Sequence, residues 1–208
     1  MADIRIGGLA RLSTCDWPGE LVATVFCQGC AWACPYCHNP HLIPARSAHE
    51  LAWPDVLAFL ESRRGLLDAV VFSGGEPTLQ AELPAAVRAA RALGFRIGLH
   101  TGGPSPERLA ALLPWLDWVG FDVKAPFDEY ARTTGVPGSG GKALASLRLL
   151  AASGVAFEVR TTVHPALLDD AALSRLRDDL AGLGLRDHKI QAFRAAGCRD
   201  AILAASAQ

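Results

Sequence analysis

Apolar and polar positions follow a regular rhythm along this chain, in which short β-rich runs take turns with longer segments rich in Ala, Leu and Arg. The short runs predict strands, and the longer segments have the composition of helices. The expected strands are 21–27, 69–73, 95–101, 117–123, 156–163 and 189–193. The expected helices are 53–63, 80–93, 105–113, 143–153 and 170–183, with a further small helix in the tail, 195–208.

Turn and cap residues support this division of the chain. Pro54 suits the first turn of a helix, and Gly94 and Gly154 suit helix ends. Repeated strand and helix units imply right-handed crossovers and a parallel α/β sheet. Six such units predict a partial (β/α)6 barrel with outer helices. No linker interrupts the rhythm, so we expect one domain over 1–208, with its barrel core at about 21–194.

The alternation of side chains within two strands adds a second prediction. Over 156–163 the odd positions are mostly apolar, whereas Glu158 and Arg160 share the opposite face. Asp122 and Lys124 likewise share one face at the end of 117–123. A parallel strand buried on both sides would be apolar on both faces. We therefore expect the charged faces to point into the barrel, near the carboxyl ends of the strands, where they can meet a polar ligand.

Composition and charge narrow the class of protein. The formal net charge is -1 and the pI is near 6.6, so no basic surface indicates a nucleic-acid or anionic-membrane partner. The first residues lack the pattern of a signal peptide, and no apolar run approaches the ~18 residues of a membrane span. We expect a cytoplasmic protein, in which clustered cysteines bind metals more often than they form disulfides. The isolated cysteines Cys15 and Cys198 are expected to be free thiols packed as small apolar groups.

Four of the six cysteines lie within eleven positions, starting at Cys27, the last residue of the first expected strand. Cys30, Cys34 and Cys37 form a C-x3-C-x2-C pattern, with the aromatic Tyr36 directly before the last thiol. Three closely spaced thiolates on a loop suit an iron–sulfur cluster, and a cluster held by only three cysteines keeps one iron open. With Cys27 the loop also offers four thiolates, so a structural zinc site is the alternative. Structural zinc pairs usually lie further apart in sequence.

A second motif, Ser-Gly-Gly-Glu-Pro at 73–77, follows the second expected strand. Gly74 and Gly75 would let a ligand approach the backbone closely, and the Glu76 carboxylate can accept hydrogen bonds from an ammonium group. Alone, this motif could be a plain turn. Its position one strand after the cysteine loop gives it significance.

The two motifs in this order resemble the radical S-adenosylmethionine superfamily, and the resemblance covers most of the chain. It implies that the three cysteines of the loop ligate a 4Fe-4S cluster, whose fourth iron binds the amino and carboxylate groups of S-adenosylmethionine. Gly74, Gly75 and Glu76 would then receive the methionine ammonium. Tyr36 would lie near the adenine, as an aromatic contact.

Further stretches resemble the activases of glycyl-radical enzymes, and most of all those of anaerobic ribonucleoside-triphosphate reductase. They are Asp-Trp-Pro-Gly at 16–19, Phe-Cys-Gln-Gly-Cys at 26–30, Cys-Pro-Tyr-Cys-His-Asn-Pro at 34–40, Asp-Val-Lys at 122–124 and Arg-Thr-Thr-Val at 160–163. This resemblance implies reductive cleavage of S-adenosylmethionine to a 5′-deoxyadenosyl radical, which takes a hydrogen atom from a glycine of the partner enzyme. It also implies a low-potential electron donor such as flavodoxin or ferredoxin.

Roles carry over to individual positions by the same resemblance. Asp122 and Lys124 match an Asp-x-Lys element that contacts S-adenosylmethionine, and Arg160 matches a basic residue near its carboxylate. For Arg160 an internal salt bridge to Glu158 or Asp122 is an equally good expectation. His164 continues the charged face of its strand and is a further candidate cofactor contact, whereas Gln191 and Arg194, near the last strand, are left without a role.

The chain departs from the family pattern at two places. His-Thr-Gly-Gly at 100–103 stands where relatives often have Asp-Thr-Asn-Gly, so an asparagine contact is expected to be missing. Cys27 stands where an apolar residue is usual, and its place in a strand favours a buried thiol over a fourth ligand. Three alternatives stay open: a pyruvate formate-lyase-type activase, a 7-carboxy-7-deazaguanine synthase-like enzyme, and a noncatalytic zinc or iron–sulfur module.

Overall fold

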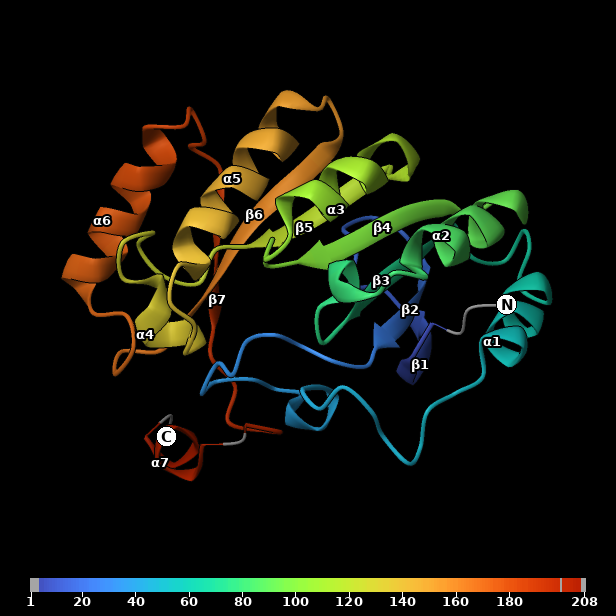
Figure 1. Ribbon diagram of the computed structural model, residues 1–208, viewed down its shortest axis with the longest axis horizontal. Coiled ribbons are helices and arrows are strands. Elements are labelled where there is room, and N and C mark those ends of the chain that lie inside the picture. The colour runs from blue at the N-terminus through green and yellow to red at the C-terminus, as the bar shows by residue number, and fades with distance from the viewer. Residues whose placement is uncertain (1–3, 199, 207–208) are drawn as a thin grey trace.

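The computed structural model describes residues 4–198 and 200–206, and within them one seven-stranded sheet has the strand order β1-β2-β3-β4-β5-β6-β7 (Figure 1). β1 pairs with β2 antiparallel, and all later neighbours are parallel. The strands are β1 Ile6–Ser13, β2 Val22–Cys27, β3 Ala69–Gly74, β4 Arg96–Thr101, β5 Trp118–Asp122, β6 Ala156–Val163 and β7 His188–Ala192. The predicted α/β class with a parallel sheet and outer helices is confirmed, and all six predicted strands form.

The helices follow the strands as predicted, with one addition. They are α1 Trp53–Glu61, α2 Leu83–Ala92, α3 Pro106–Leu112, α4 Tyr130–Thr134, α5 Ser139–Ala152, α6 Asp170–Ala181 and α7 Ala201–Ala205, with 3-10 turns at Pro40–Leu42, Pro77–Leu79 and Leu113–Trp115. The sequence predicted neither β1 nor α4. The small tail helix expected within 195–208 is α7, while positions 199, 207 and 208 lie outside the described residues.

One face of the curved sheet packs under the longer helices, and in Figure 1 α2, α3, α5 and α6 lie along that face. On α2, the buried Leu83, Ala86, Val87 and Ala90 have the spacing of one helical face. They belong to the same core as alternate strand residues such as Phe72. Burial of this apolar face is what holds the outer layer on the sheet.

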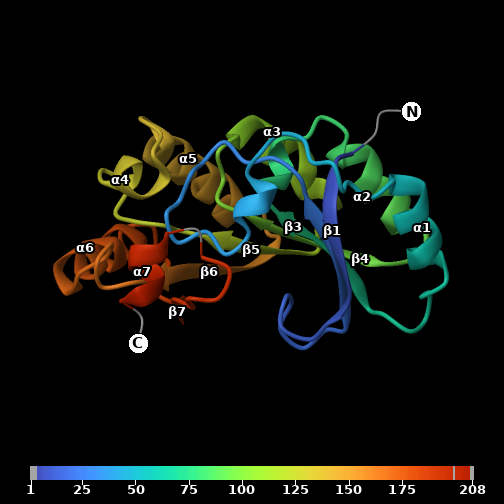
Figure 2. The same ribbon diagram turned by 90° about the horizontal axis from the view of Figure 1, so that it is seen from below.

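The other face of the sheet forms the inside of the partial barrel, and its amino-terminal end is closed by the loop between β1 and β2. Trp17 of this loop stacks on Trp118 with ring centroids 5.4 Å apart, and both pack with Val71 in a small apolar cluster. Gly98 on β4 makes room for the ring, because a Cβ there would lie 2.9 Å from it. The barrel is therefore filled at this end. Figure 2 shows β7 and α7 on the opposite side of the molecule from β1 and α1.

None of the helices in the described part of the chain is both long and apolar enough to cross a lipid bilayer.

Candidate functional site

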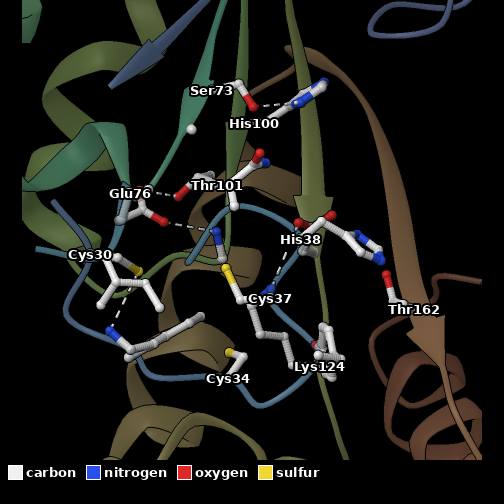
Figure 3. A pocket seen from close by; sticks show the side chains of 18 residues that line it. Cys30, Cys34, Cys37, His38, Ser73, Glu76, His100, Thr101, Lys124 and Thr162 are labelled. Atoms are coloured by element: carbon white, nitrogen blue, oxygen red, sulfur yellow. Dashed lines mark hydrogen bonds and ion pairs between the residues drawn. The ribbon is translucent and has the colours of Figure 1, made fainter. Parts of the chain in front are cut away.

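A cavity opens at the carboxyl ends of β2 to β6, where parallel α/β barrels carry their sites. Figure 3 shows side chains from the cysteine loop and from the ends of several strands turned toward it. Its lining is Cys30, Trp32, Cys34, Tyr36, Cys37, His38, Asn39, Ile43, Ser73, Gly74, Gly75, Glu76, His100, Thr101, Gly102, Asp122, Lys124 and Thr162. The structure thus brings both sequence motifs and the Asp-x-Lys element to one place.

Backbone hydrogen bonds hold the start of the cysteine loop in an extended strip beside residues 42–43. The Gly29 N–H donates to the Leu42 carbonyl at 2.8 Å, and the Cys30 N–H donates to the Ile43 carbonyl at 3.0 Å. Within the loop, the Cys37 N–H donates to the Cys34 carbonyl at 3.1 Å. These bonds satisfy backbone groups that a buried loop would otherwise leave without partners. The loop is therefore ordered by its own backbone.

The Gly-Gly-Glu segment lies directly against this strip. The Gly75 N–H donates to the Cys27 carbonyl, and the Glu76 N–H donates to the Gly29 carbonyl, both at 2.9 Å. A Cβ on Gly74 would lie 2.5 Å from the Cys27 nitrogen, and one on Gly75 would lie 2.3 Å from the Gly29 oxygen. Close approach of two backbones requires glycine at both positions. Gly74 and Gly75 therefore allow the two motifs to pack together. From the sequence, only the close approach of a ligand was expected at these glycines.

Glu76 is buried, and donors from two segments, at Thr78 and at residues 101–102, hold its carboxylate in place. Oε1 accepts hydrogen bonds from the Thr78 N–H at 3.1 Å, the Thr78 hydroxyl at 2.6 Å and the Thr101 hydroxyl at 2.7 Å. Oε2 accepts one, from the Gly102 N–H at 3.0 Å. Burial raises the pKa of Glu76, while these donors act to lower it. Oε1 thus accepts three hydrogen bonds and Oε2 only one, so Oε2 is the oxygen with room for a ligand donor.

Asp122 stands between two positive groups. Its Oδ1 accepts a hydrogen bond from Arg160 Nε at 3.0 Å and forms an ion pair with Arg160 Nη2 at 2.9 Å, and its Oδ2 lies 3.8 Å from Lys124 Nζ. Burial acts to raise the pKa of Asp122, but Arg160 and Lys124 outweigh it and hold the pKa below its ordinary value. Asp122 is therefore a charged acceptor at the cavity wall.

A layer of polar groups separates the cavity from the closed end of the barrel. His100 Nε2 donates to the Asp16 carbonyl at 2.7 Å, and its Nδ1 lies 3.1 Å from the Ser73 hydroxyl. Burial and the neighbouring Arg160 charge lower the pKa of His100 to about 4, so the ring is neutral at pH 7. The Arg160 guanidinium fits above Gly120, where a Cβ would lie 2.7 Å from it. His100 and Arg160 thus form the floor of the site.

Among the thiols, burial raises the pKa of Cys30 to about 12 and also raises that of Cys34, while Lys124 acts in the opposite direction on both. Such thiols keep their protons at neutral pH until a metal displaces them. Cys27 differs in position, because its side chain lies in the core at the end of β2 and is absent from the cavity lining. It is a buried thiol.

The donor set fits a cluster better than a single ion. Among residues 4–198 and 200–206, no three His, Cys, Asp or Glu side chains are placed to share one metal ion. A cubane cluster makes a different demand, since each of three thiolates binds its own iron. Cys30, Cys34 and Cys37 all line the cavity, so they can hold such a cluster and leave one iron without a protein ligand. A four-thiolate zinc site would also need Cys27, which does not line the cavity.

Most candidate residues from the sequence meet at this cavity, but two do not line it. Arg160 points at Asp122, which is the internal salt bridge left open above. His164 lies beyond the end of β6, where its strand alternation no longer applies, and it packs against Phe193 at a centroid distance of 4.8 Å and against α7. Neither Gln191 nor Arg194 lines the cavity, although the Arg194 carbonyl accepts a hydrogen bond from His38 at 2.9 Å.

Several lining residues were not singled out from the sequence. Trp32 lies inside the cysteine motif itself, so its position was a usable signal, and Thr162 lies on the predicted inward face of its strand. Gly102 offered no such signal, because its importance depends on a distant contact. A Cβ on Gly102 would lie 2.2 Å from the Trp32 ring, which packs over it.

Comparison with known proteins places the chain in a family. Residues 24–176 match the Radical SAM superfamily. The protein named "Putative glycyl-radical enzyme activating enzyme MJ1227" of Methanocaldococcus jannaschii is 33% identical over 172 residues, which are 79% of this chain and 70% of that protein. The pyruvate formate-lyase-activating enzyme of Clostridium pasteurianum is 29% identical over 171 residues, 79% of this chain and 71% of that protein.

Solved structures support the fold alone, because their sequence identities are low. A structure of anSMEcpe with bound AdoMet has a TM-score of 0.65 at 16% identity and covers 80% of this chain and 49% of its own. Streptococcus suis SuiB bound to S-adenosylmethionine has a TM-score of 0.62 at 12% identity, covering 80% of this chain and 39% of its own. The chain thus spans less than half of either protein. By its sequence matches, it belongs to the radical SAM superfamily, and within it to the family of the glycyl-radical-enzyme activating enzymes.

Proposed function

We propose that this protein generates the glycyl radical of an anaerobic ribonucleoside-triphosphate reductase. One observation carries the proposal. The five stretches that resemble activases of that enzyme are spread over 16–163, yet they meet at one cavity and its floor. Cys34 and Lys124 line the cavity, whereas Asp16 and Arg160 contact His100 beneath it. A shared location is expected if these stretches act in one reaction.

The residues of the cavity divide the task of holding the cofactors. Cys30, Cys34 and Cys37 would hold a 4Fe-4S cluster, and the free capacity of Glu76 Oε2 would accept the methionine ammonium of S-adenosylmethionine. When bound, these cofactors supply a 5′-deoxyadenosyl radical by one-electron reductive cleavage of the sulfonium. The chain's own contribution is to position the reactants and to exclude competing reactions.

Other side chains would orient the nucleoside part and the carboxylate of S-adenosylmethionine. Tyr36 is buried beside the cluster thiols and offers an aromatic face to the adenine. Asp122 is a charged acceptor and Lys124 a charged donor at the wall, so they can bind hydroxyl and carboxylate groups respectively. Arg160 acts through Asp122, which it holds by a hydrogen bond from Nε and an ion pair from Nη2.

A protein substrate suits the architecture. The sheet is open, with β1 and β7 at its two edges, and the cavity lies at the mouth of this open barrel. A loop of a partner enzyme can reach a cavity at the mouth of an open barrel more easily than one inside a closed barrel. The proposed partners are therefore the reductase and a low-potential electron donor such as flavodoxin or ferredoxin.

A pyruvate formate-lyase-type activase is the second candidate, because one relative with that name is 29% identical over 79% of the chain. The two candidates differ only in the protein that receives the radical. The experiment must therefore offer both targets to the same preparation.

The test uses anaerobically reconstituted protein, S-adenosylmethionine and a chemical reductant, mixed in parallel with an anaerobic ribonucleotide reductase and with pyruvate formate-lyase from one source organism. Electron paramagnetic resonance should detect a glycyl radical on the reductase and none on the lyase. The matched control is a reductase whose acceptor glycine is replaced by alanine, which should stay silent. A signal on the lyase alone would reject the proposed target, and absence of 5′-deoxyadenosine in every mixture would reject the activity.

A further inference from the structure

Lys124 has surroundings that binding a cofactor carboxylate does not explain. Its Nζ lies 5.9 Å from the centroid of the Trp32 ring and 5.7 Å from that of Tyr36, and its side chain is only 16% exposed. Both rings belong to the cysteine loop itself. An ammonium near aromatic faces and partly shielded from water is held by cation–π attraction. The cluster loop thus carries a cage for one positive charge.

Contacts from α4 and the segment before it hold this cage in shape. The Lys124 N–H donates to the Tyr130 hydroxyl at 3.0 Å, and the Tyr130 ring meets Trp32 edge to face at 5.8 Å. The Ala33 N–H donates to the Thr134 carbonyl at 3.0 Å. Lys124 and the cysteine loop are therefore braced by the same structure, which limits how far the ammonium can move away from the thiols.

The charge of Lys124 is only partly neutralised. Asp122 is its one ion-pair partner in the described residues, and the other oxygen of Asp122 is bound by Arg160. Two positive charges thus share the single negative charge of Asp122. Of the other groups that face the site, Glu76 is a carboxylate held by four hydrogen bonds, and His100 is neutral. Lys124 acts on Cys30 and on Cys34, and on Cys30 the Glu76 carboxylate acts in the opposite direction. Burial acts to lower the pKa of Lys124, but the acidic groups around it, Tyr36 first among them, hold that pKa well above its ordinary value, so Lys124 stays charged.

We infer that Lys124 sets the reduction potential of the cluster held by Cys30, Cys34 and Cys37. Reduction adds one electron from an external low-potential donor, so the site gains one negative charge, and no bond breaks and no proton is taken up. A fixed positive charge in a poorly hydrated position stabilises that added electron. Lys124 is thus a tuning residue for the cluster, whichever protein receives the radical.

The test is a potentiometric titration of the reconstituted protein without S-adenosylmethionine, followed by electron paramagnetic resonance of the reduced cluster. Lys124→Met should make reduction about tenfold less favourable, which is about 59 mV lower for a one-electron couple. Lys124→Arg keeps the charge and should stay close to the unmodified protein. Asp122→Asn removes the negative neighbour and should shift the potential upward. Lys142→Met, on the surface of α5, is the matched control and should change nothing.

Opposite shifts in Lys124→Met and Asp122→Asn support the inference, because damage to the loop would move both potentials the same way. A potential in Lys124→Met equal to that of Lys142→Met overturns it, and so do shifts of the two variants in one direction. If Lys124→Met holds no cluster, Asp122→Asn decides the question, since an unchanged or lowered potential there rejects charge tuning. None of these readings depends on turnover, so they stand apart from the choice of target enzyme.

Discussion

The two ends of the partial barrel are built on opposite principles. At the amino-terminal end, Trp17 and Trp118 stack among small aliphatic side chains, and the interior is filled. At the carboxyl-terminal end, the same strands present thiols, carboxylates and an ammonium group around a cavity. His100 and Arg160 form the boundary between the two. The apolar end supplies packing energy, which leaves the other end free to carry groups that cost stability when buried.

This division predicts that substitutions at one end change cofactor binding and that substitutions at the other change stability. The largest expected effect is at the open end. Cys34→Ala should abolish cluster assembly while the fold persists, because a cubane needs all three thiolates. Iron content and visible absorption after anaerobic reconstitution measure the loss, and circular dichroism measures the fold. The control is Cys15→Ala, an exposed thiol at the closed end, which should keep its cluster. Normal iron loading of Cys34→Ala would refute the ligand assignment.

Substitutions at the closed, amino-terminal end of the barrel should lower the free energy of unfolding. Trp17→Ala should lower it by about 3–5 kcal/mol, the usual cost of deleting a large buried ring. Urea unfolding of the metal-free protein measures this cost. Trp115→Ala is the matched control, and its ring is 38% exposed, so we expect a loss of about 1 kcal/mol or less. Folded Trp17→Ala should still load iron, and failure to do so would mean that the two ends are not independent.

Gly75→Ala tests the junction between the two motifs. The added Cβ would lie 2.3 Å from the Gly29 carbonyl oxygen, so backbone must move. We expect about 1–3 kcal/mol of destabilisation, as for other overpacked sites, together with weaker cluster binding. Gly141→Ala on α5 meets nothing within 4 Å and should be stabilised slightly, by about 0.5–1 kcal/mol. Equal iron loading in both variants would show that the junction is unnecessary for the site.

His100, at the boundary between the two ends of the barrel, should make the stability of the folded protein depend on pH. His100 is neutral in the folded protein down to about pH 4, whereas in the unfolded chain it binds a proton below about pH 6.5. Its folded pKa is thus depressed, so stability is lost as the pH falls from about 6.5 toward 4, at about 1.4 kcal/mol per pH unit. His100→Gln should remove this component from urea unfolding curves. His49→Gln, an exposed site, should keep it, and identical slopes in both variants would contradict the assignment.

The parallel sheet was predictable because most strands are short β-rich runs between turn residues, and such local patterns survive folding. β1 was missed because Gly7 and Gly8 weaken its strand pattern, and it forms by antiparallel pairing with β2. α4 was missed because five residues ending in two threonines carry little helical signal. Both elements depend on tertiary contacts.

At the site, the sequence identified the thiols, the Gly-Gly-Glu segment and the Asp-x-Lys pair, because each is a short motif whose spacing is visible in the sequence and which starts at or soon after a strand end. The sequence could not decide whether Arg160 forms an ion pair with Asp122, as the structure shows, or lines the cavity. The strand alternation also failed at His164, which follows the last residue of β6. Long-range contacts such as that of Trp32 with Gly102 are invisible to local patterns.

Two backbone hydrogen bonds, from Gly75 to Cys27 and from Glu76 to Gly29, have a consequence for protein design. They join the cysteine loop and the Gly-Gly-Glu segment into one structural unit, which includes the ends of two adjacent strands. A designer who grafts only the cysteine loop onto another parallel barrel would leave its backbone without these partners. Any graft of this site therefore needs at least a pair of neighbouring strand ends, with their glycines, rather than a run of cysteines alone.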